Sequence, residues 1–354
     1  MKMPSSGTKA STGPKSTYVT FGRRLGNAEG NLIPDYNYKG GTMNASFIQR
    51  SSAAGVLGIV LTIGSANAAA YSWTEIVIPS IGPLGLAAGI NDKGQVAVNN
   101  ADNSKSGIYH NGIFAPLSAP PAGYSKVSAI GINNGGNITG GAFPPSDPTH
   151  EQGYVLVRSH YTFFSRPGWS NTEGRAIAQS GLVTGYNYDD TFTTCAGFVY
   201  DPATGVFTDA TPPGSGPCFS TAQGMNASGR ITGDGRLPDG TGRYGFIWQQ
   251  GTLVQGNRAL APFLAQIRIG EANTAARGIN DAGVIVGFLS SGTAAGFVGS
   301  DSRGFQLLIP PGGDAPGVTV ACGGINNLRQ VVCEVTDAAG NTRGFIGTPG
   351  ANDQ

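Results

Sequence analysis

The fold is decided by the stretch Ala87-Ala-Gly-Ile-Asn-Asp-Lys-Gly-Gln-Val96, because variants of it return five more times along the chain. Its anchor residue, Asn91, recurs at positions 133, 178, 226, 280 and 326, so the period is 42 to 54 residues. The anchor is Asn in every copy except the third, which carries Ala178. Periods of this size are typical of stacked supersecondary units rather than of one wound domain.

Each copy has the composition of a tight β-hairpin. Asn at the first turn position and Gly at the fourth favour a type I turn whose last residue is left-handed. The Asn carboxamide can also accept a hydrogen bond from a backbone N–H two residues on. We interpret the following as structural turn residues: Asn91, Gly94, Asn133, Asn226, Gly229, Asn280, Gly283 and Asn326. A calcium loop is the weaker alternative, because acidic oxygens at alternate positions are missing, and we expect no other cofactor or metal.

A second motif follows each hairpin by 16 to 20 residues and reads as a β-strand led by glycine, as in Gly197-Phe-Val199 and Gly344-Phe-Ile346. A fourth short run, such as Thr204-Gly-Val-Phe-Thr208, follows in most copies. Four antiparallel strands repeated at this period are typical of a propeller blade. The sequence therefore predicts an all-β, six-bladed β-propeller, with an open β-solenoid as the alternative.

The last repeat lacks its fourth strand, because the chain ends soon after Gly347-Thr-Pro-Gly350. A segment that resembles a fourth strand, Tyr71-Ser-Trp-Thr-Glu-Ile-Val-Ile-Pro79, instead precedes the first hairpin. We expect this segment to complete the sixth blade and to cover strand edges that would otherwise promote association.

Four cysteines fall into two local pairs, which fits an oxidising compartment. Cys322 and Cys333 are equally far from the centre of the sixth turn, between Asn327 and Leu328, so we expect them to face each other across the hairpin and form a disulfide. Cys195 and Cys218 flank the junction of the third and fourth repeats, where a disulfide would join adjacent blades.

The N-terminal part predicts export. Residues 43–68 combine a basic start, an apolar core from Ala53 to Gly64 and an Ala-x-Ala site, so we expect a signal peptide cleaved after Ala68. The apolar run is shorter than the ~20 residues of a transmembrane helix. Residues 1–42 have no apolar periodicity, and we expect them to be disordered or to precede the true start at Met43. Residues 69–350 then form the propeller, and 351–354 a short tail.

The exported part carries 15 Lys and Arg against 19 Asp and Glu, a net charge of −4, without a basic run. This balance argues against a nucleic-acid or anionic-membrane partner. We expect a monomer without a transmembrane helix, located outside the cell or in the periplasm.

Residues that would identify a reaction are few. The three histidines, His110, His150 and His160, lack metal-ligand spacing and are interpreted as surface or turn residues. Paired carboxylates at Asp189-Asp190, or at Asp234 with Asp239, are the candidates for glycosidase or lyase chemistry. Tryptophans and tyrosines can line a glycan- or peptide-binding face, but in strands they more often pack between blades.

Six copies of Gly-Ile-Asn-x-x-Gly-x-Val-x-Gly, each followed by a Gly-Phe-Val/Ile strand, resemble the bacterial extracellular HAF-repeat family from Tyr71 to about Gly347. The chain departs from the His-Ala-Phe signature, since it carries Ala196-Gly-Phe198 and Ala295-Gly-Phe297. The resemblance implies a secreted or surface protein and assigns no catalytic residues. We expect a binding or scaffold module for an extracellular glycan or protein; the alternatives are a carbohydrate-active enzyme that uses loop carboxylates and a purely structural surface protein.

Overall fold

The computed structural model describes residues 35–39, 42–46, 71–211, 220–236, 243–249, 274–289, 295–300 and 304–350. The chain divides into two compact units, Met1–Ala66 and Asn67–Gln354. In the first unit, β1 (Asp35–Lys39) and β2 (Thr42–Ser46) form an antiparallel hairpin, which the sequence reasoning does not predict. Residues 47–68 of the expected signal segment, with the site at Ala68, and the tail 351–354 lie outside the described residues.

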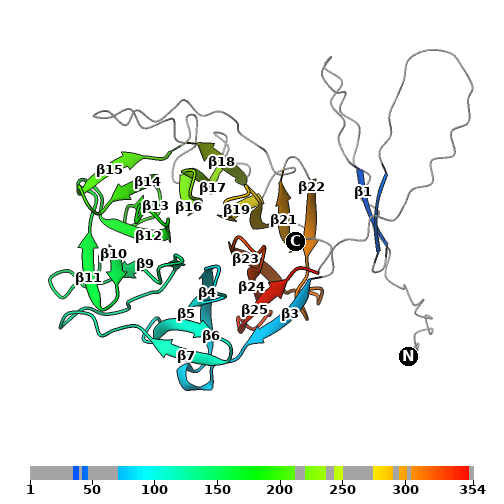
Figure 1. Cartoon of the computed structure of the whole chain (residues 1–354), viewed down its shortest axis with the longest axis horizontal. Coiled ribbons are helices and arrows are strands. Elements are labelled where there is room, and N and C mark those ends of the chain that lie inside the picture. Colours follow the sequence, from blue (N-terminus) through cyan, green and yellow to red (C-terminus); the bar gives the residue numbers. More distant parts are fainter. Residues whose placement is uncertain are drawn as a thin grey trace, which may run out of the picture. The chain divides into compact units, whose positions relative to one another are not determined.

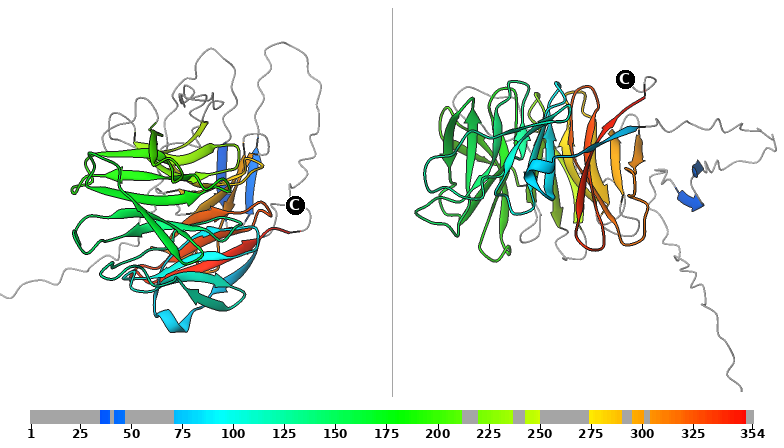
Figure 2. Two further views of the ribbon diagram at one scale, coloured as in Figure 1. Left: turned by 60° about the vertical axis from the view of Figure 1, so that its left-hand side comes forward. Right: turned by 90° about the horizontal axis from the view of Figure 1, so that it is seen from below.

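The second unit is built from antiparallel sheets arranged around a common centre (Figures 1 and 2), so the prediction of an all-β propeller is confirmed. The first repeat contains β4 (Leu84–Ile90), β5 (Val96–Asn100), β6 (Ser106–His110) and β7 (Ile113–Pro116). The second contains β8 (Gly131–Ile132), β9 (Ile138–Ala142), β10 (Gln152–Val157) and β11 (His160–Phe164). The third contains β12 (Asn171–Ile177), β13 (Val183–Tyr188), β14 (Cys195–Asp201) and β15 (Val206–Asp209).

The remaining repeats continue this order. The described strands of the fourth repeat are β16 (Ser220–Met225), β17 (Arg230–Arg236) and β18 (Arg243–Gln249), and the fourth strand expected near residues 250–254 lies outside the described residues. The fifth repeat contains β19 (Thr274–Ile279), β20 (Ile285–Leu289), β21 (Gly296–Ser300) and β22 (Gly304–Leu308). The sixth contains β23 (Thr319–Ile325), β24 (Val331–Thr336) and β25 (Thr342–Thr348).

The N-terminal strand of this unit, β3 (Ser72–Ile76), supplies the fourth strand of the sixth sheet. It pairs antiparallel with β25, with Ile76 opposite Gly344 and Ser72 opposite Thr348. The two strands lie side by side in Figure 1 although they belong to opposite ends of the unit. A short 3-10 helix, Pro79–Ile81, then leads into β4. The predicted pairing of the N-terminal strand with the last strand of the sixth repeat is therefore observed.

The hydrophobic core lies between neighbouring sheets. One cluster, for example, packs Val199 of the third repeat against Phe246 and Trp248 of the fourth. Trp73 of β3 packs against the cluster of the fifth and sixth repeats. Each sheet thus buries one face against its neighbour, and these aromatic residues stabilise blade packing instead of forming an exposed binding face.

The hairpin turns between the first two strands of each repeat share one geometry. In the first turn, the N–H of Gly94 donates to the carbonyl of Asn91 over 2.9 Å, and Gly94 has φ of 73°. The Asn91 Oδ1 accepts from the N–H of Lys93 and of Gln95, at 3.1 and 3.0 Å. Arg329 replaces glycine in the sixth turn and still adopts φ of 59°.

The Asn side chains also join neighbouring repeats, a role that the sequence does not indicate. The Nδ2 group of Asn91 donates to the carbonyl of Asn133 over 3.0 Å, and that of Asn326 donates to Asn91 over 3.0 Å, which links the sixth repeat to the first. The same bond joins Asn133 to Ala178, Asn226 to Asn280 and Asn280 to Asn326. Only Ala178 has no side-chain donor for the next repeat.

This gap yields a prediction. We expect Ala178→Asn to raise the free energy of unfolding by about 1 kcal/mol, because the new carboxamide completes both its own turn and the bond to the carbonyl of Asn226. The backbone already has the required geometry, since Gly181 N–H donates to Ala178 O over 3.0 Å and Gly181 has φ of 88°. Ala178→Asp is the matched control, because its carboxylate accepts the turn hydrogen bonds but cannot donate to Asn226. Equal denaturation midpoints for the two variants would contradict the inter-repeat role.

The disulfide expected in the sixth hairpin is present between Cys322 and Cys333, whose Cα atoms are 3.9 Å apart. The two residues are register partners, as predicted, but for a partly different reason. The turn is centred on Leu328, and a β-bulge at Gly323 restores the opposition of the two cysteines. Cys195 is also disulfide-bonded. Cys218 lies outside the described residues, so its pairing with Cys195 stays a prediction.

Candidate functional site: the central cavity

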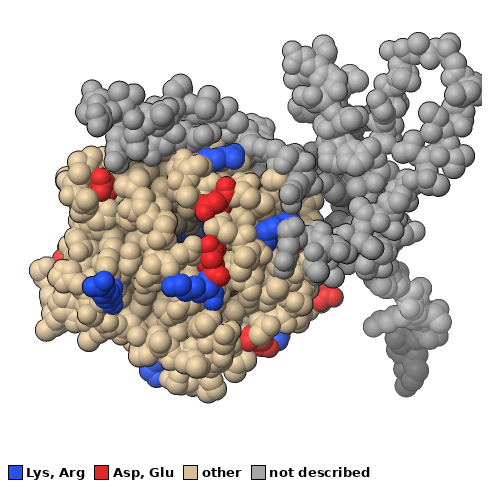
Figure 3. Space-filling view, viewed as in Figure 1, with Lys and Arg blue, Asp and Glu red and all other residues tan. Residues whose placement is uncertain are grey.

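A cavity of ≈ 360 Å³ lies at the centre of the propeller and is lined by residues of all six repeats. Its wall is formed by strand β8 with the residue before it, by the C-terminal ends of the innermost strands β4, β12, β16, β19 and β23, and by the Asn turns that follow these strands. Figure 3 shows a central hollow on one face, with acidic and basic side chains beside it. Small-molecule sites are typically concave and of about this size or larger.

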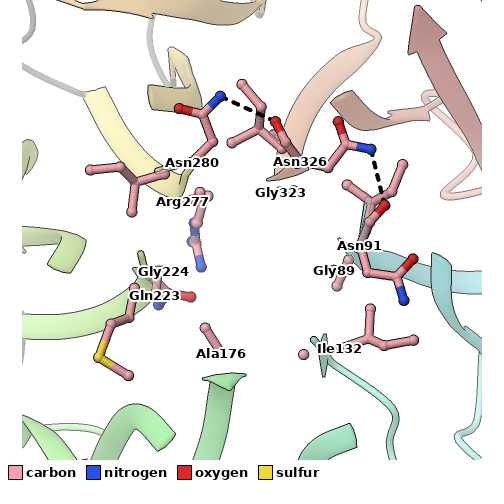
Figure 4. A pocket seen from close by; sticks show the side chains of 18 of the residues that line it. Gly89, Asn91, Ile132, Ala176, Gln223, Gly224, Arg277, Asn280, Gly323 and Asn326 are labelled. Carbon is pink, nitrogen blue, oxygen red and sulfur yellow. Dashed lines mark hydrogen bonds between the residues drawn. The ribbon is translucent and has the colours of Figure 1, made fainter. Parts of the chain in front are cut away.

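One position of the repeat, three residues before the turn Asn, controls what projects into this cavity. In four repeats it is the single extra residue of a β-bulge, since the register skips Arg175, Gln223, Arg277 and Gly323. In the first repeat the register skips Ala88 together with Gly89, and in the second the position carries Ile130; Ala88 and Ile130 also line the cavity. A bulged residue leaves the strand alternation, so its side chain can be re-aimed. Figure 4 shows Arg277 and Gln223 directed toward the centre of the cavity.

The residue at this position is polar in three consecutive repeats. Arg175, Gln223 and Arg277 come from repeats three, four and five. The other half of the wall carries Gly323, Ala88 and Ile130 from repeats six, one and two. In a six-fold arrangement, repeats three positions apart face each other. At this position of the repeat, the cavity therefore has a sector of arginine and amide side chains opposite a sector of small and apolar residues, and Glu334 adds a carboxyl group to the second sector.

Arg175 is held in place by three contacts. Its Nε donates to Gln223 Oε1 over 2.8 Å, and its Nη1 lies 3.2 Å from Glu173 Oε1. The guanidinium carbon is 5.9 Å from the centre of the Tyr186 ring. A guanidinium that is held over an aromatic ring and bonded at one edge loses little entropy on binding a further acceptor.

Arg277 repeats this arrangement two blades away. Its guanidinium carbon lies 5.2 Å from the centre of the Phe288 ring, and its Nη2 is 3.8 Å from Asp234 Oδ1. Phe288 and Tyr186 occupy the same place in their repeats, eight residues after the turn anchor. The recurrence of arginine on an aromatic ring in two repeats indicates a common way of holding guanidinium groups at the cavity wall.

Glu334 occupies that same place in the sixth repeat. It lies within β24, and its side chain lines the cavity. Its Oε1 accepts a hydrogen bond from the backbone N–H of Ala87 in the first repeat. Burial raises the pKa of Glu334 to about 7, and the hydrogen bond from Ala87 and the positive charges of Arg175 and Arg277 oppose this rise. Near neutral pH the group can therefore be present both as a hydrogen-bond donor and as a carboxylate.

The turns add a belt of acidic and amide groups to the wall. Asp92 Oδ1 accepts from the N–H of Asn327 over 2.8 Å, and Asp281 Oδ2 accepts from the Asn327 side chain, also over 2.8 Å. Asn134 Nδ2 donates to Asp92 over 2.6 Å. These carboxylates are occupied by contacts between repeats. Among the residues described, no group of His, Cys, Asp and Glu is arranged to hold a metal ion.

The carboxylates considered from the sequence do not form a site in the described part of the chain. Asp189 closes its own loop, where it accepts from Thr193 N–H over 2.8 Å, and these hydrogen bonds lower its pKa to about 2. Asp190 lies 3.1 Å from His150 Nε2, whose ring also contacts Asp147. Asp234 is buried and accepts from Thr221 over 2.8 Å. Asp239 lies outside the described residues.

A second buried carboxyl, Glu151, lies outside the cavity lining and yields a pH prediction. Burial, together with neighbouring Glu173, raises the pKa of Glu151 to about 8, and Tyr188 donates to its Oε2 over 2.8 Å. Because the folded-state pKa lies above the unfolded value, the native state binds the extra proton. The stabilisation is complete below pH ~4.5 and is lost as the pH rises toward about 8.

We therefore expect Glu151→Gln, which keeps an acceptor for Tyr188, to be more stable than the wild type by about 1 kcal/mol or more at pH 9, and to show a flatter stability profile between pH 5 and 9. Urea unfolding at several pH values measures this. Glu75→Gln is the control, because Glu75 is paired with Arg343 at the surface and its pKa is lowered. A profile as steep in Glu151→Gln as in the wild type would contradict the assignment.

No protein-family model and no curated protein matches the sequence. Among solved structures, a luciferin-regenerating enzyme matches with 10% identity over 79% of this chain and 95% of that chain, at a TM-score of 0.48. Virginiamycin B lyase from Staphylococcus aureus matches with 9% identity, 79% and 99% coverage and a TM-score of 0.39. The β-propeller domain of the Trilobed protease from Pyrococcus furiosus matches with 11% identity, 77% and 100% coverage and a TM-score of 0.39. These are similarities of fold and carry no functional argument.

Proposed function

We propose that the propeller is a binding module and that its ligand occupies the central cavity. This proposal rests on a contrast between two positions of the repeat, the turn Asn and the residue three positions before it. The turn Asn is the same in five of the six repeats and is used in bonds between repeats. The bulge position three residues earlier differs between repeats, and it projects Arg175, Gln223 and Arg277 into one sector of the cavity. A scaffold alone does not require unlike residues at this position.

We also propose that the module acts outside the cytoplasm, as a HAF-type repeat protein. The disulfide between Cys322 and Cys333 supports an oxidising compartment. Within the described residues, no helix has the length and apolar character needed to span a bilayer. N-terminal sequencing of the protein recovered from the periplasm or medium of a bacterial host tests export. The expected first residue is Ala69, and recovery of the intact chain from the cytoplasm alone would contradict it.

The binding role is tested with the full chain against a glycan array and a library of small organic acids, amides, amines and sugars, read out by thermal shift and titration calorimetry. Gly323→Leu is the informative variant, because the atoms nearest to a Cβ at Gly323 are backbone atoms of Ala88 and Ala87, at 3.7 to 3.9 Å, and a leucine there fills cavity space. Ala339→Leu, at an exposed turn, is the matched control. We expect Gly323→Leu alone to abolish binding.

Two results would overturn this assignment. One is binding that survives in Gly323→Leu, which would place the ligand outside the cavity. The other is the absence of any binding, which would favour a purely structural role. A turnover screen on bound glycans distinguishes a binding module from the carbohydrate-active alternative, since the former leaves them intact.

A further inference from the structure

We infer that the ligand of the central cavity is a small organic monocarboxylate with an apolar body, its carboxylate bound by Arg175 and Arg277 beside Gln223, and its body against Gly323, Ala88 and Ile130. This inference rests on the proposed function, since it names the class of ligand for the same cavity. It follows from the arrangement of the two sectors of the wall and from their charges.

The cationic sector fits a planar anion. Guanidinium groups present donors in a rigid fork that matches a carboxylate, and both arginines lie over aromatic rings, with the guanidinium carbons 5.9 and 5.2 Å from the ring centres. Gln223, on the repeat between them, already accepts from Arg175 through its Oε1. Its side chain carries two further N–H donors, so the three residues form one sector of donors.

The charge balance favours a single negative charge over a dianion such as phosphate. Each guanidinium has an acidic neighbour, with Glu173 3.2 Å from Arg175 and Asp234 3.8 Å from Arg277. Glu334 and the belt carboxylates Asp92 and Asp281 also line the cavity. Repulsion from these carboxylates grows with the charge of the ligand, so it disfavours a multiply charged anion more than a monocarboxylate, which replaces part of an existing pairing.

The opposite sector determines what is attached to the carboxylate. Gly323 contributes no side chain, and Ala88 and Ile130 contribute apolar side chains, while the carboxyl group of Glu334 lies beside them, hydrogen-bonded to the N–H of Ala87. A hydroxyl-rich body would lose hydrogen bonds to water there without replacement, while an apolar body is stabilised by burial. A cavity of ≈ 360 Å³ admits a molecule of the size of an aryl or short alkyl acid.

The test compares acids with their neutral amides on the full chain by titration calorimetry, with phenylacetate against phenylacetamide, hexanoate against hexanamide, and inorganic phosphate. We expect the acids to bind at least ten-fold more tightly than the amides and than phosphate. Arg175→Gln and Arg277→Gln should each weaken acid binding ten-fold or more and leave amide binding nearly unchanged. Arg166→Gln is the control, because Arg166 pairs with Asp209 outside the cavity lining. Melting curves establish that each variant is folded.

The outcomes separate this inference from the proposed function. Binding that Gly323→Leu blocks, but with acids and amides equal or with both arginine variants unchanged, overturns the carboxylate assignment and keeps the cavity as the site. Failure of both acids to bind overturns the carboxylate assignment as well. Acid binding that persists in Gly323→Leu overturns both.

Discussion

Deletion of residues 71–80 is expected to lower the free energy of unfolding by roughly 4 kcal/mol or more, the largest effect foreseen for this protein. The deletion removes Ile76 and Ile78, which are 5% and 9% exposed, and burial of each contributes about 1.5–3 kcal/mol. It also removes the strand that pairs with β25 from Gly344 to Thr348. The exposed edge of β25 should promote self-association, which light scattering detects.

A pair of point variants provides the control for this deletion. Ile76→Asp places a charge at a buried position, whereas Val77→Asp places the same charge at the neighbouring position, which is 58% exposed. We expect Ile76→Asp to reproduce most of the loss and Val77→Asp to be nearly neutral. A melting curve unchanged by the deletion would show that β3 pairs with β25 without stabilising the propeller.

Loss of the Cys322–Cys333 disulfide is expected to cost about 3 kcal/mol, because the bond restricts the unfolded chain. Both cysteines are fully buried among core residues, so the double variant Cys322→Ala, Cys333→Ala keeps a small apolar side chain at each position. Chemical denaturation measures the difference.

The control for the disulfide uses reducing agent. A reductant should lower the stability of a Cys195→Ala, Cys218→Ala variant, which retains the hairpin disulfide, by about the same amount. It should leave the variant that lacks all four cysteines unchanged. If the Cys322→Ala, Cys333→Ala protein is as stable as the wild type, the disulfide does not stabilise the fold.

The repeated strands and turns can be predicted from the sequence, because short local segments determine them and these segments recur in each repeat. The turn composition at Asn91 and Gly94 recurs, so counting it gives the number of repeats, and the unmatched segment at Tyr71 indicates how the sixth blade is completed. The side-chain bonds between repeats are not accessible in this way. A bond such as that from Asn326 to Asn91 joins residues 235 positions apart, and turn chemistry alone already explains why Asn is present.

The candidate site is missed for a different reason. Arg175, Gln223 and Arg277 are bulge residues, so the alternation of a strand does not indicate where their side chains point. A signal was nevertheless present in the aligned copies. The position three residues before the anchor reads Ala88, Ile130, Arg175, Gln223, Arg277 and Gly323, and it varies in charge while its neighbours stay alike. Comparing unlike residues at equivalent positions would have selected it.

The adjacent acidic residues Asp189 and Asp190, offered as candidates for the enzyme alternative, do not face a common site. Asp189 and Asp190 are neighbours in the chain, but in the structure one closes its own loop and the other contacts His150. Proximity along a strand or loop does not bring two carboxylates to one substrate, because successive side chains point in different directions.

A crystal structure of the full chain with phenylacetate is the decisive test of the central cavity as a carboxylate site. We predict that the acid lies in the central cavity, with its carboxylate within hydrogen-bond distance of the guanidinium groups of Arg175 and Arg277 and its ring against Ala88 and Ile130. Phenylacetate bound on the outer strands or loops, with the cavity occupied by solvent alone, would contradict it.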